Sequence, residues 1–194
     1  MKPLLIGLHG LARTGKDTAA RYLASQWSLY SYAFADPIKA AIAQLFNLSH
    51  AHIEGNLKEA LLPGIGKSPR QLMQLLGTEW GREHVHPELW LLLAAQNIAY
   101  QREVDQSHYN GVVIRDVRFE NEAQWIRSQG GRVVHILRPD AEAVSAHSSE
   151  SGIAIHDNDF VIHNEGTIED FQQQLGRMMA ILRILSVHDT RPAA

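Results

Sequence analysis

Apolar runs and amphipathic stretches alternate along the chain, and this pattern predicts strands that alternate with helices. Predominantly apolar runs predict buried strands at 4–8, 29–34, 111–119, 132–139 and 160–164. Helical periodicity begins at residues 17, 35, 68, 86, 120 and 167. Strands that alternate with helices are typical of an α/β fold, in which a parallel sheet is covered by helices on both faces.

The long, mostly helical stretch between the second and third strands departs from this simple alternation. We expect it to form a substrate-binding insert at about 37–109, with an irregular part at 47–68 that is rich in Gly, His and Pro. A polar stretch at about 139–157 has little periodicity and predicts a lid. No repeat or linker divides the sequence. We therefore expect one domain, 1–194, whose core comprises 1–36, 110–140 and 158–188.

The first strand leads into the glycine-rich stretch "GLHGLARTGKDT", from Gly7 to Thr18. A loop between a buried strand and a helix N-terminus presents several backbone N–H groups to one anion. Gly10 and Gly15 permit the close approach that a phosphate needs, and Lys16 would reach the outer phosphates. Arg13 lies either beside the nucleotide or in solvent. The structural alternative is a turn with a solvated lysine.

This stretch departs from the phosphate-loop pattern at Asp17, where a magnesium-binding hydroxyl is expected. Thr18 follows directly and supplies that hydroxyl one residue later, while Asp17 would contact the metal directly or through water. Asp116 ends an apolar strand, so it either binds magnesium through water, holds Arg118, or caps the next helix.

Phosphoryl transfer between nucleotides needs positive charge on the donor, on the acceptor phosphate and over the transferred group. Cations at the carboxyl ends of parallel strands and in the first turns of the following helices suit this task. Three positions meet the requirement: Lys39, Arg70 and Arg118. Arg70 lies in the first turn of a helix, where its charge opposes the helix dipole and calls for a compensating anion.

Two other residues each have two interpretations, and the histidines do not predict a site. Arg138 closes a strand before Pro139, and it serves either a lid or only a strand exit. Trp80 either stacks on a base or belongs to an apolar stripe with Leu72. The eleven histidines include pairs spaced by two residues, but no third ligand accompanies them, so a zinc site is not expected.

Composition excludes several classes of function. Cysteine is absent, which rules out disulfides and thiolate chemistry. A net charge of −3 and a pI near 6.4 do not predict binding to a nucleic-acid polymer. No apolar run approaches the roughly 20 residues of a membrane span. We therefore expect a cytoplasmic protein without membrane partners, located in the host cytoplasm if a virus encodes it.

The chain resembles the deoxynucleoside monophosphate kinases known best from bacteriophages. The segments that carry the resemblance run in the family's order along nearly the whole chain: "GLARTGKDTAA", "FADPIK", "SPRQLMQLLGTEWGRE", "VVIRDVRFENEA", "GGRVVHILRP" and "HNEGTIEDF". The resemblance implies a P-loop kinase fold with a five-stranded parallel sheet, a substrate subdomain and a lid. It also implies transfer of the ATP γ-phosphoryl group to a deoxynucleoside monophosphate with Mg²⁺.

The resemblance also assigns roles to residues of this sequence. Gly15, Lys16, Asp17 and Thr18 would hold ATP and magnesium, with Arg13 nearby. Lys39, Arg70 and Arg118 would hold the acceptor, with Ile38 lining its pocket. The residues themselves add Trp80 as a candidate at the acceptor site, and Lys16, Arg118 and Arg138 as candidates to supply catalytic charge. The "HNEGT" turn is similar to the adenine-side loop of dephospho-coenzyme A kinases, which would place Asn164 and Gly166 near the ATP base.

Two rival functions remain at this stage. One is a P-loop kinase for another small metabolite, such as dephospho-coenzyme A. The other is an ATP-binding switch without phosphoryl transfer, which would not need the acceptor cations. The expected partners are ATP and a deoxynucleoside monophosphate. The apolar stripe of the C-terminal helix suits either packing on the sheet or a dimer, so the chain is expected to be a monomer or a homodimer.

Overall fold

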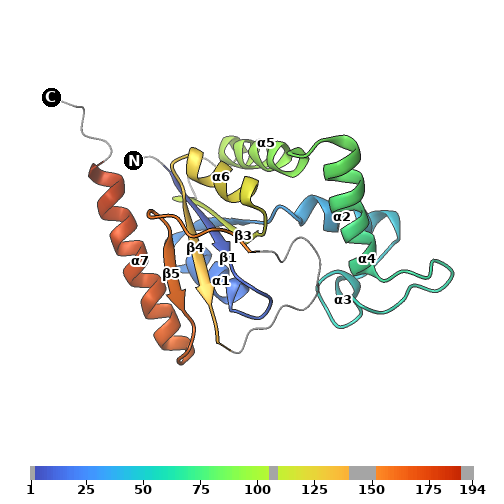
Figure 1. The fold of residues 1–194 in the computed structure, drawn as a ribbon, viewed down its shortest axis with the longest axis horizontal. Helices are drawn as coiled ribbons and strands as arrows, with labels where there is room; N and C mark the ends of the chain where they lie inside the picture. Colours follow the sequence, from blue (N-terminus) through green and yellow to red (C-terminus); the bar gives the residue numbers. More distant parts are fainter. Residues whose placement is uncertain (1–2, 105–108, 140–151, 189–194) are drawn as a thin grey trace. The chain divides into compact units, whose positions relative to one another are not determined.

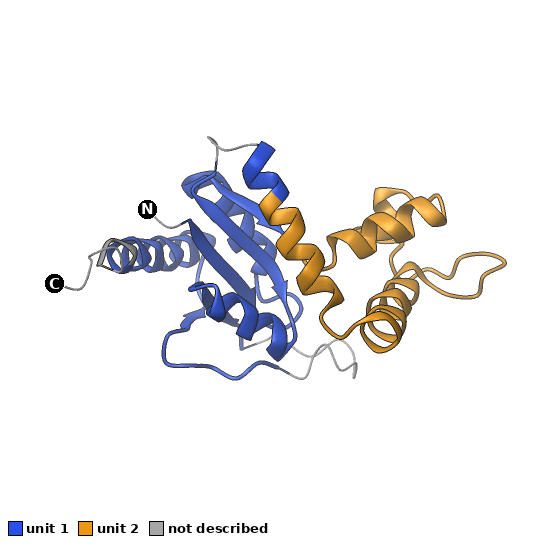
Figure 2. Cartoon of the chain, turned by 90° about the horizontal axis from the view of Figure 1, so that it is seen from above, with its two compact units in different colours: residues 1–32, 100–194 blue, residues 33–99 orange. Residues whose placement is uncertain are grey.

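The structure is a computed structural model that describes residues 3–104, 109–139 and 152–188. The chain divides into two compact units, shown in Figure 2. Unit 1 comprises residues 1–32 and 100–194, and unit 2 comprises residues 33–99. Much of the lid predicted at 139–157 lies outside the described residues.

Unit 1 contains a five-stranded sheet in the order β2-β3-β1-β4-β5 (Figure 1). The strands are β1 (Leu4–His9), β2 (Leu29–Tyr32), β3 (Gly111–Val117), β4 (Arg132–Leu137) and β5 (Phe160–His163). All four neighbouring pairs are parallel, with Ile6 of β1 opposite Val113 of β3 and Arg132 of β4. The predicted parallel sheet of five strands is therefore confirmed.

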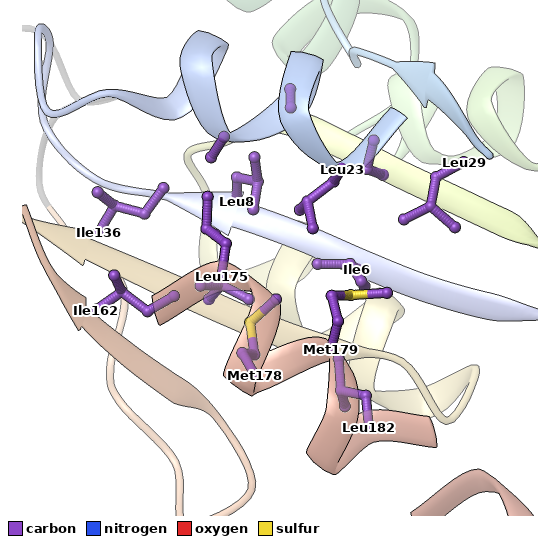
Figure 3. Close-up of a cluster of buried hydrophobic side chains, with 14 of the residues drawn as sticks. Ile6, Leu8, Leu23, Leu29, Ile136, Ile162, Leu175, Met178, Met179 and Leu182 are labelled. Atoms are coloured by element: carbon purple, nitrogen blue, oxygen red, sulfur yellow. The ribbon is translucent and has the colours of Figure 1, made fainter. Parts of the chain in front are cut away.

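Helices cover both faces of this sheet. They are α1 (Lys16–Trp27), α6 (Glu120–Ser128) and α7 (Ile168–His188). The last residues of α5 (Leu89–Val104), a helix that begins in unit 2, also belong to unit 1. Side chains of α1 and α7 meet those of the strands in one buried cluster, in which Leu23 and Met179 lie near Ile6 (Figure 3). Ile126 of α6 packs on the opposite face, where a Cβ added to Gly7 would come within 2.5 Å of it.

Parallel strands all end at the same edge of the sheet, and this edge receives the loop that follows β1. Because β1 lies between β3 and β4, the loop emerges at the middle of the edge rather than at its side. In open parallel sheets, ligands bind at the carboxyl edge where the strand order reverses. The fold thus brings the glycine-rich loop to the expected binding edge.

Unit 2 is helical and has a small core of its own. Its elements are α2 (Asp36–Leu45), α3 (His50–Ile53), α4 (Pro69–Gln74), η1 (Leu75–Val85) and the first part of α5. One cluster of this core joins the buried side chains of Ile42, Ile53 and Leu72, one from each of α2, α3 and α4. The irregular part predicted at 47–68 contains the short helix α3, and hydrogen-bonded turns fill most of the rest, from 54 to 68.

The helix predicted to start at residue 68 is α-helical only at its beginning. Ser68 and Gln71 form a capping box at the start of α4, but from Leu75 the helix continues as the π-helix η1. The indole Nε1 of Trp90 donates a 2.7 Å hydrogen bond to the carbonyl of Gly77 inside this wider helix. A Cβ added to Gly81 would lie 2.6 Å from the Trp90 ring, so this close contact requires glycine.

The π-helix also removes the apolar stripe that the sequence pattern indicated. In a π-helix the backbone hydrogen bonds join residues i and i+5, so successive residues are rotated about the helix axis by a smaller angle than in an α-helix. Side chains at α-helical spacing therefore no longer lie on one face. Leu72 is 8% exposed, whereas Trp80 is 52% exposed. The interpretation of Trp80 as a core residue is therefore wrong.

An ion-pair network fixes the segment that leads into β5. Arg127 of α6 donates to both carboxylate oxygens of Asp159 and to Glu120, and His135 of β4 lies 3.1 Å from Asp159 Oδ2. The Asp159 side chain is fully buried, and burial alone would raise its pKa. The hydrogen bonds from Arg127, from the His156 backbone N–H and from His135 outweigh burial and lower the pKa of Asp159 to about 2.

None of the helices in the described stretches combines the length and the apolar character that a membrane span requires.

We expect Asp159→Asn to lower the free energy of unfolding at pH 7 by about 1–2 kcal/mol, because a pKa below the ordinary value stabilises the charged folded form. This contribution is present above the unfolded-state pKa and is lost as the pH falls through the folded-state pKa. Since these values are 3.8 and about 2, the gap between wild type and variant should narrow clearly by about pH 3. Urea unfolding at several pH values measures the gap, and a constant gap would contradict the role of the Asp159 charge.

Candidate active site

The loop from Gly10 to Gly15 adopts a conformation that only glycine tolerates at its two ends. Gly10 has φ 154° and Gly15 has φ 105°. A Cβ added to Gly10 would lie 2.4 Å from the carbonyl oxygen of Ile136 in β4, and one added to Gly15 would lie 2.7 Å from Nδ2 of Asn164. The loop is thus pressed against the end of the sheet, and Gly15 forms the N-cap of α1.

Polar side chains hold this loop in place from inside and from outside. Thr14, which is 1% exposed, donates from its hydroxyl to the Leu11 carbonyl over 2.9 Å. Asn164, in the turn after β5, donates from Nδ2 to the Thr14 carbonyl over 2.9 Å. Lys16 folds back over the loop, where Nζ donates to the Gly10 and Leu11 carbonyls over 2.7 and 2.6 Å. The lysine ammonium is therefore held directly above the glycine-rich turn.

A pocket of about 460 Å³ opens beside this loop. Ligand pockets commonly have volumes of about 300–1,000 Å³, so it can hold a nucleotide-sized molecule. The structure brings together here the residues predicted for the donor side: Arg13, Gly15, Lys16, Asp17, Thr18, Asn164 and Gly166. Arg138, predicted as a lid or catalytic residue, lines the same pocket.

Sequence reasoning missed three residues that line the same pocket: Arg21, Ile168 and Phe171. Arg21 lies four residues after Asp17, so the two share one face of α1, and this spacing could have revealed it. Ile168 is 52% exposed, whereas Phe171 is 2% exposed. Arg13, Arg21 and Arg138 give the pocket the positive charge that an anionic ligand requires.

A second, narrow cleft of about 20 Å³ lies on another side of the loop. His9, Gly10, Lys16, Val117 and Arg118 are among its lining residues. Lys16 lines both cavities, so its side chain joins the pocket that contains Arg138 to the cleft that contains Arg118. Asp116 lies half-buried in β3, two residues before Arg118.

His9, the last residue of β1, was also missed. Burial lowers its pKa below the ordinary value, and the positive charges of Lys16 and Arg118 act in the same direction, against the effect of its hydrogen bond to Val117. Nδ1 lies 2.9 Å from the Val117 carbonyl, which can only accept, so Nδ1 carries the proton of a neutral ring. His9 thereby ties the strand before the glycine loop to the strand end before Arg118. In the sequence, only its position directly before Gly10 indicates that His9 lies next to the glycine loop.

The remaining predicted residues lie in unit 2. Lys39 of α2 forms a 2.6 Å ion pair with Glu54, and Arg70 of α4 forms one with Glu59. Ile38 Cδ1 would lie 3.0 Å from a Cβ added to Gly77 of η1, so α2 and η1 meet closely at this point. The exposed Trp80 ring is available for stacking.

Among the described residues, no group of three or more His, Cys, Asp or Glu side chains could hold a metal ion by itself. Mg²⁺ is usually held by one or two carboxylates together with substrate phosphates and water. The oxygens of Asp17 and Thr18 in the phosphate-loop pocket suit this mode of binding.

The parallel sheet, the glycine loop at the centre of its edge and the lysine folded over that loop define a P-loop kinase of the α/β class. Residues 4–67 and 66–175 match the family model described as deoxynucleotide monophosphate kinase. The chain belongs to this family.

Individual relatives resemble the chain over most of its length. A protein of Acanthamoeba polyphaga mimivirus is 35% identical over 181 residues, which cover 89% of this chain and 94% of that protein. The deoxynucleotide monophosphate kinase of Enterobacteria phage T4 is 26% identical, with 92% and 99% covered. A solved structure from Thermus thermophilus shares the fold, with a TM-score of 0.51, 20% identity, and 94% and 99% covered.

The close packing of the loop predicts that Gly15→Ala weakens nucleotide binding to this pocket by tenfold or more, because the new methyl group would displace Asn164 from the loop. Gly64→Ala is the matched control, since Gly64 also has a positive φ of 77° but nothing lies within 4 Å of an added Cβ. Both variants should lose about 1–2 kcal/mol of stability from the left-handed backbone. Calorimetric titration with ATP and thermal unfolding separate the two effects. Equal ATP affinity in both variants would show that the Asn164 contact is unimportant.

Proposed function

We propose that this protein transfers the γ-phosphoryl group of ATP to a deoxynucleoside monophosphate. A phosphate oxygen of the acceptor forms a bond to the γ-phosphorus, the bond from that phosphorus to the β–γ bridging oxygen breaks, and ADP and the deoxynucleoside diphosphate result. The observation that carries this proposal is the pocket beside the glycine loop, where Lys16 and three arginines surround a nucleotide-sized space in a member of this family.

The donor nucleotide would bind in that pocket. Backbone N–H groups at the start of α1 would hold the phosphates together with Lys16, because a helix N-terminus favours negative charge. Arg13 and Arg138 would neutralise phosphate charge from two directions. Asn164 would act chiefly through the loop, since its amide already holds the Thr14 carbonyl. Gly166 and the exposed Ile168 would border the base.

Magnesium would bind beside the phosphates through Thr18 and Asp17, with Asp116 acting through water or by holding Arg118. When bound, the ion neutralises the charge that develops on the bridging and terminal oxygens. The side chains of this chain would provide the orientation. Lys16 would stay in contact with the γ-phosphoryl group during its transfer, because Lys16 lines both the pocket and the cleft that contains Arg118.

The cations predicted for the acceptor nucleotide are Lys39, Arg70 and Arg118, and each would bind its phosphate. Ile38 would line the acceptor pocket, and the exposed ring of Trp80 would contact the base of the acceptor. On this proposal unit 2 is the substrate-binding insert of a single P-loop kinase domain. Stacking on Trp80 is tolerant of base identity, because every base offers an aromatic face.

Three substitutions test these roles. We expect Lys16→Ala to reduce kcat by about a hundredfold or more, because it removes charge stabilisation from the transferred group.

Arg70→Ala and Arg118→Ala should raise KM for the acceptor about tenfold to a hundredfold and leave ATP binding measurable. Arg177→Ala, which removes an exposed arginine of α7, is the control. Normal acceptor use by both arginine variants would refute the acceptor site.

A substrate panel tests the class of acceptor. ATP is supplied with each of the four common deoxynucleoside monophosphates, with the corresponding ribonucleotides, and with dephospho-coenzyme A and gluconate. We expect diphosphate product from at least one deoxynucleotide and none from the last two compounds. Failure to phosphorylate any nucleotide would overturn the proposed function, and product from dephospho-coenzyme A would replace it.

A further inference from the structure

Arg70 is attached to the preceding loop by both its main chain and its side chain. Its backbone N–H donates to the Lys58 carbonyl over 3.0 Å, although the first N–H groups of a helix have no partner within the helix. The Arg70 side chain donates from Nε to Oε1 of Glu59, the residue that follows Lys58. Two turns bracket Glu59, one from Lys58 N–H to Gly55 O and one from Ala60 N–H to Leu57 O. The position of Arg70 therefore depends on this short stretch of loop.

The sequence called for a compensating anion at this position, because the charge of Arg70 opposes the dipole of α4. Glu59 is that anion. Glu54 pairs in the same way with Lys39, so the two acceptor cations predicted in unit 2 each receive a carboxylate from residues 54–59.

The ion pair with Glu59 uses only one of the nitrogen atoms of the Arg70 guanidinium group. A guanidinium group has five N–H donors in a rigid fork. Glu59 engages Nε, and within the described residues the terminal Nη1 and Nη2 groups have no hydrogen-bond partner. The Arg70 side chain is 33% exposed, so a ligand can reach these terminal groups. An end-on pair of N–H groups is suited to two oxygens of a phosphate.

We propose that Glu59 is a positioning residue that orders the Arg70 guanidinium and directs its terminal N–H groups toward the acceptor phosphate. This inference rests on the proposed function, because it takes Arg70 as a ligand of the acceptor. Glu59 does not compete with the phosphate for the same donors. It restrains a long, flexible side chain before the ligand arrives, so that less conformational freedom is lost on binding.

The effect of Glu59 is expected in acceptor affinity alone. Glu59→Ala should raise KM for the deoxynucleoside monophosphate about three- to tenfold, which is the range for ordering one long side chain, with kcat and KM for ATP unchanged. Glu59→Gln should retain most of the affinity, because its amide oxygen still accepts from Nε. Calorimetric titration with the best deoxynucleotide of the substrate panel gives a second readout that does not depend on turnover.

A double-mutant cycle with Arg70 makes the test specific. In the Arg70→Ala background, Glu59→Ala should have no further effect on acceptor KM, because the side chain that it positions is gone. Glu83→Ala is the charge-matched control, since Glu83 is another exposed carboxylate of unit 2. It should leave acceptor KM unchanged in both backgrounds.

The outcomes separate this inference from the proposed function. If Arg70→Ala raises acceptor KM but Glu59→Ala does not, the acceptor site stands and the positioning role is wrong. A fall in KM in Glu59→Ala would show competition with the phosphate and would also overturn the inference. If Glu59→Gln behaves like Glu59→Ala, positioning through the Nε hydrogen bond is refuted. If Arg70→Ala leaves acceptor KM unchanged, both the acceptor assignment and this inference are wrong.

Discussion

The contact between the glycine loop and the end of β4 is the constraint on which unit 1 depends. The carbonyl of Ile136 leaves no space for a side chain at residue 10, and the Asn164 amide leaves none at residue 15. This contact brings the chain from the centre of the sheet directly into the N-terminus of α1. A loop with side chains at these two positions would stand away from the sheet. The candidate site is thus a consequence of close backbone packing.

The same packing explains why polar groups in the interior of unit 1 serve the loop rather than solvent. Thr14 and Asn164 donate to loop carbonyls, and His9 donates to the strand end before Arg118. Burial keeps the His9 ring neutral, so it adds no charge beside Lys16 and Arg118. Elsewhere in this unit, Asp159 pairs with Arg127 and contacts His135, so the charge of the buried Asp159 carboxylate is compensated. Lys16, by contrast, lines both cavities together with arginines of the loop, of α1 and of the strand ends.

The sequence predicted much of the fold because its main signals are local. The strand at 4–8, the glycines of the loop and the helix that follows are read from consecutive residues, and the structure agrees with them. The π-helix could not be read in this way, because it involves a contact between Gly77 and Trp90, thirteen residues apart. Of the polar and charged side chains that line the pocket and the narrow cleft, those within the loop were predicted, whereas Arg21 and His9 were not. Both lie in regular elements, where the spacing from Asp17 or the place before Gly10 is only a weak signal until the elements are placed around the loop.

Unit 2 orders its cations by a different principle from unit 1. The phosphate loop depends on buried backbone and on glycine, and its geometry is determined by packing. Lys39 and Arg70 are instead restrained by exposed or half-exposed carboxylates. Such pairs add little to folding stability, typically about 0–1 kcal/mol, and are screened by salt. Their value would therefore lie in orientation rather than in stability. On the proposed function, the packed loop would bind a triphosphate that is the same in every turnover, whereas the ion pairs of unit 2 would orient Lys39 and Arg70 toward the acceptor phosphate.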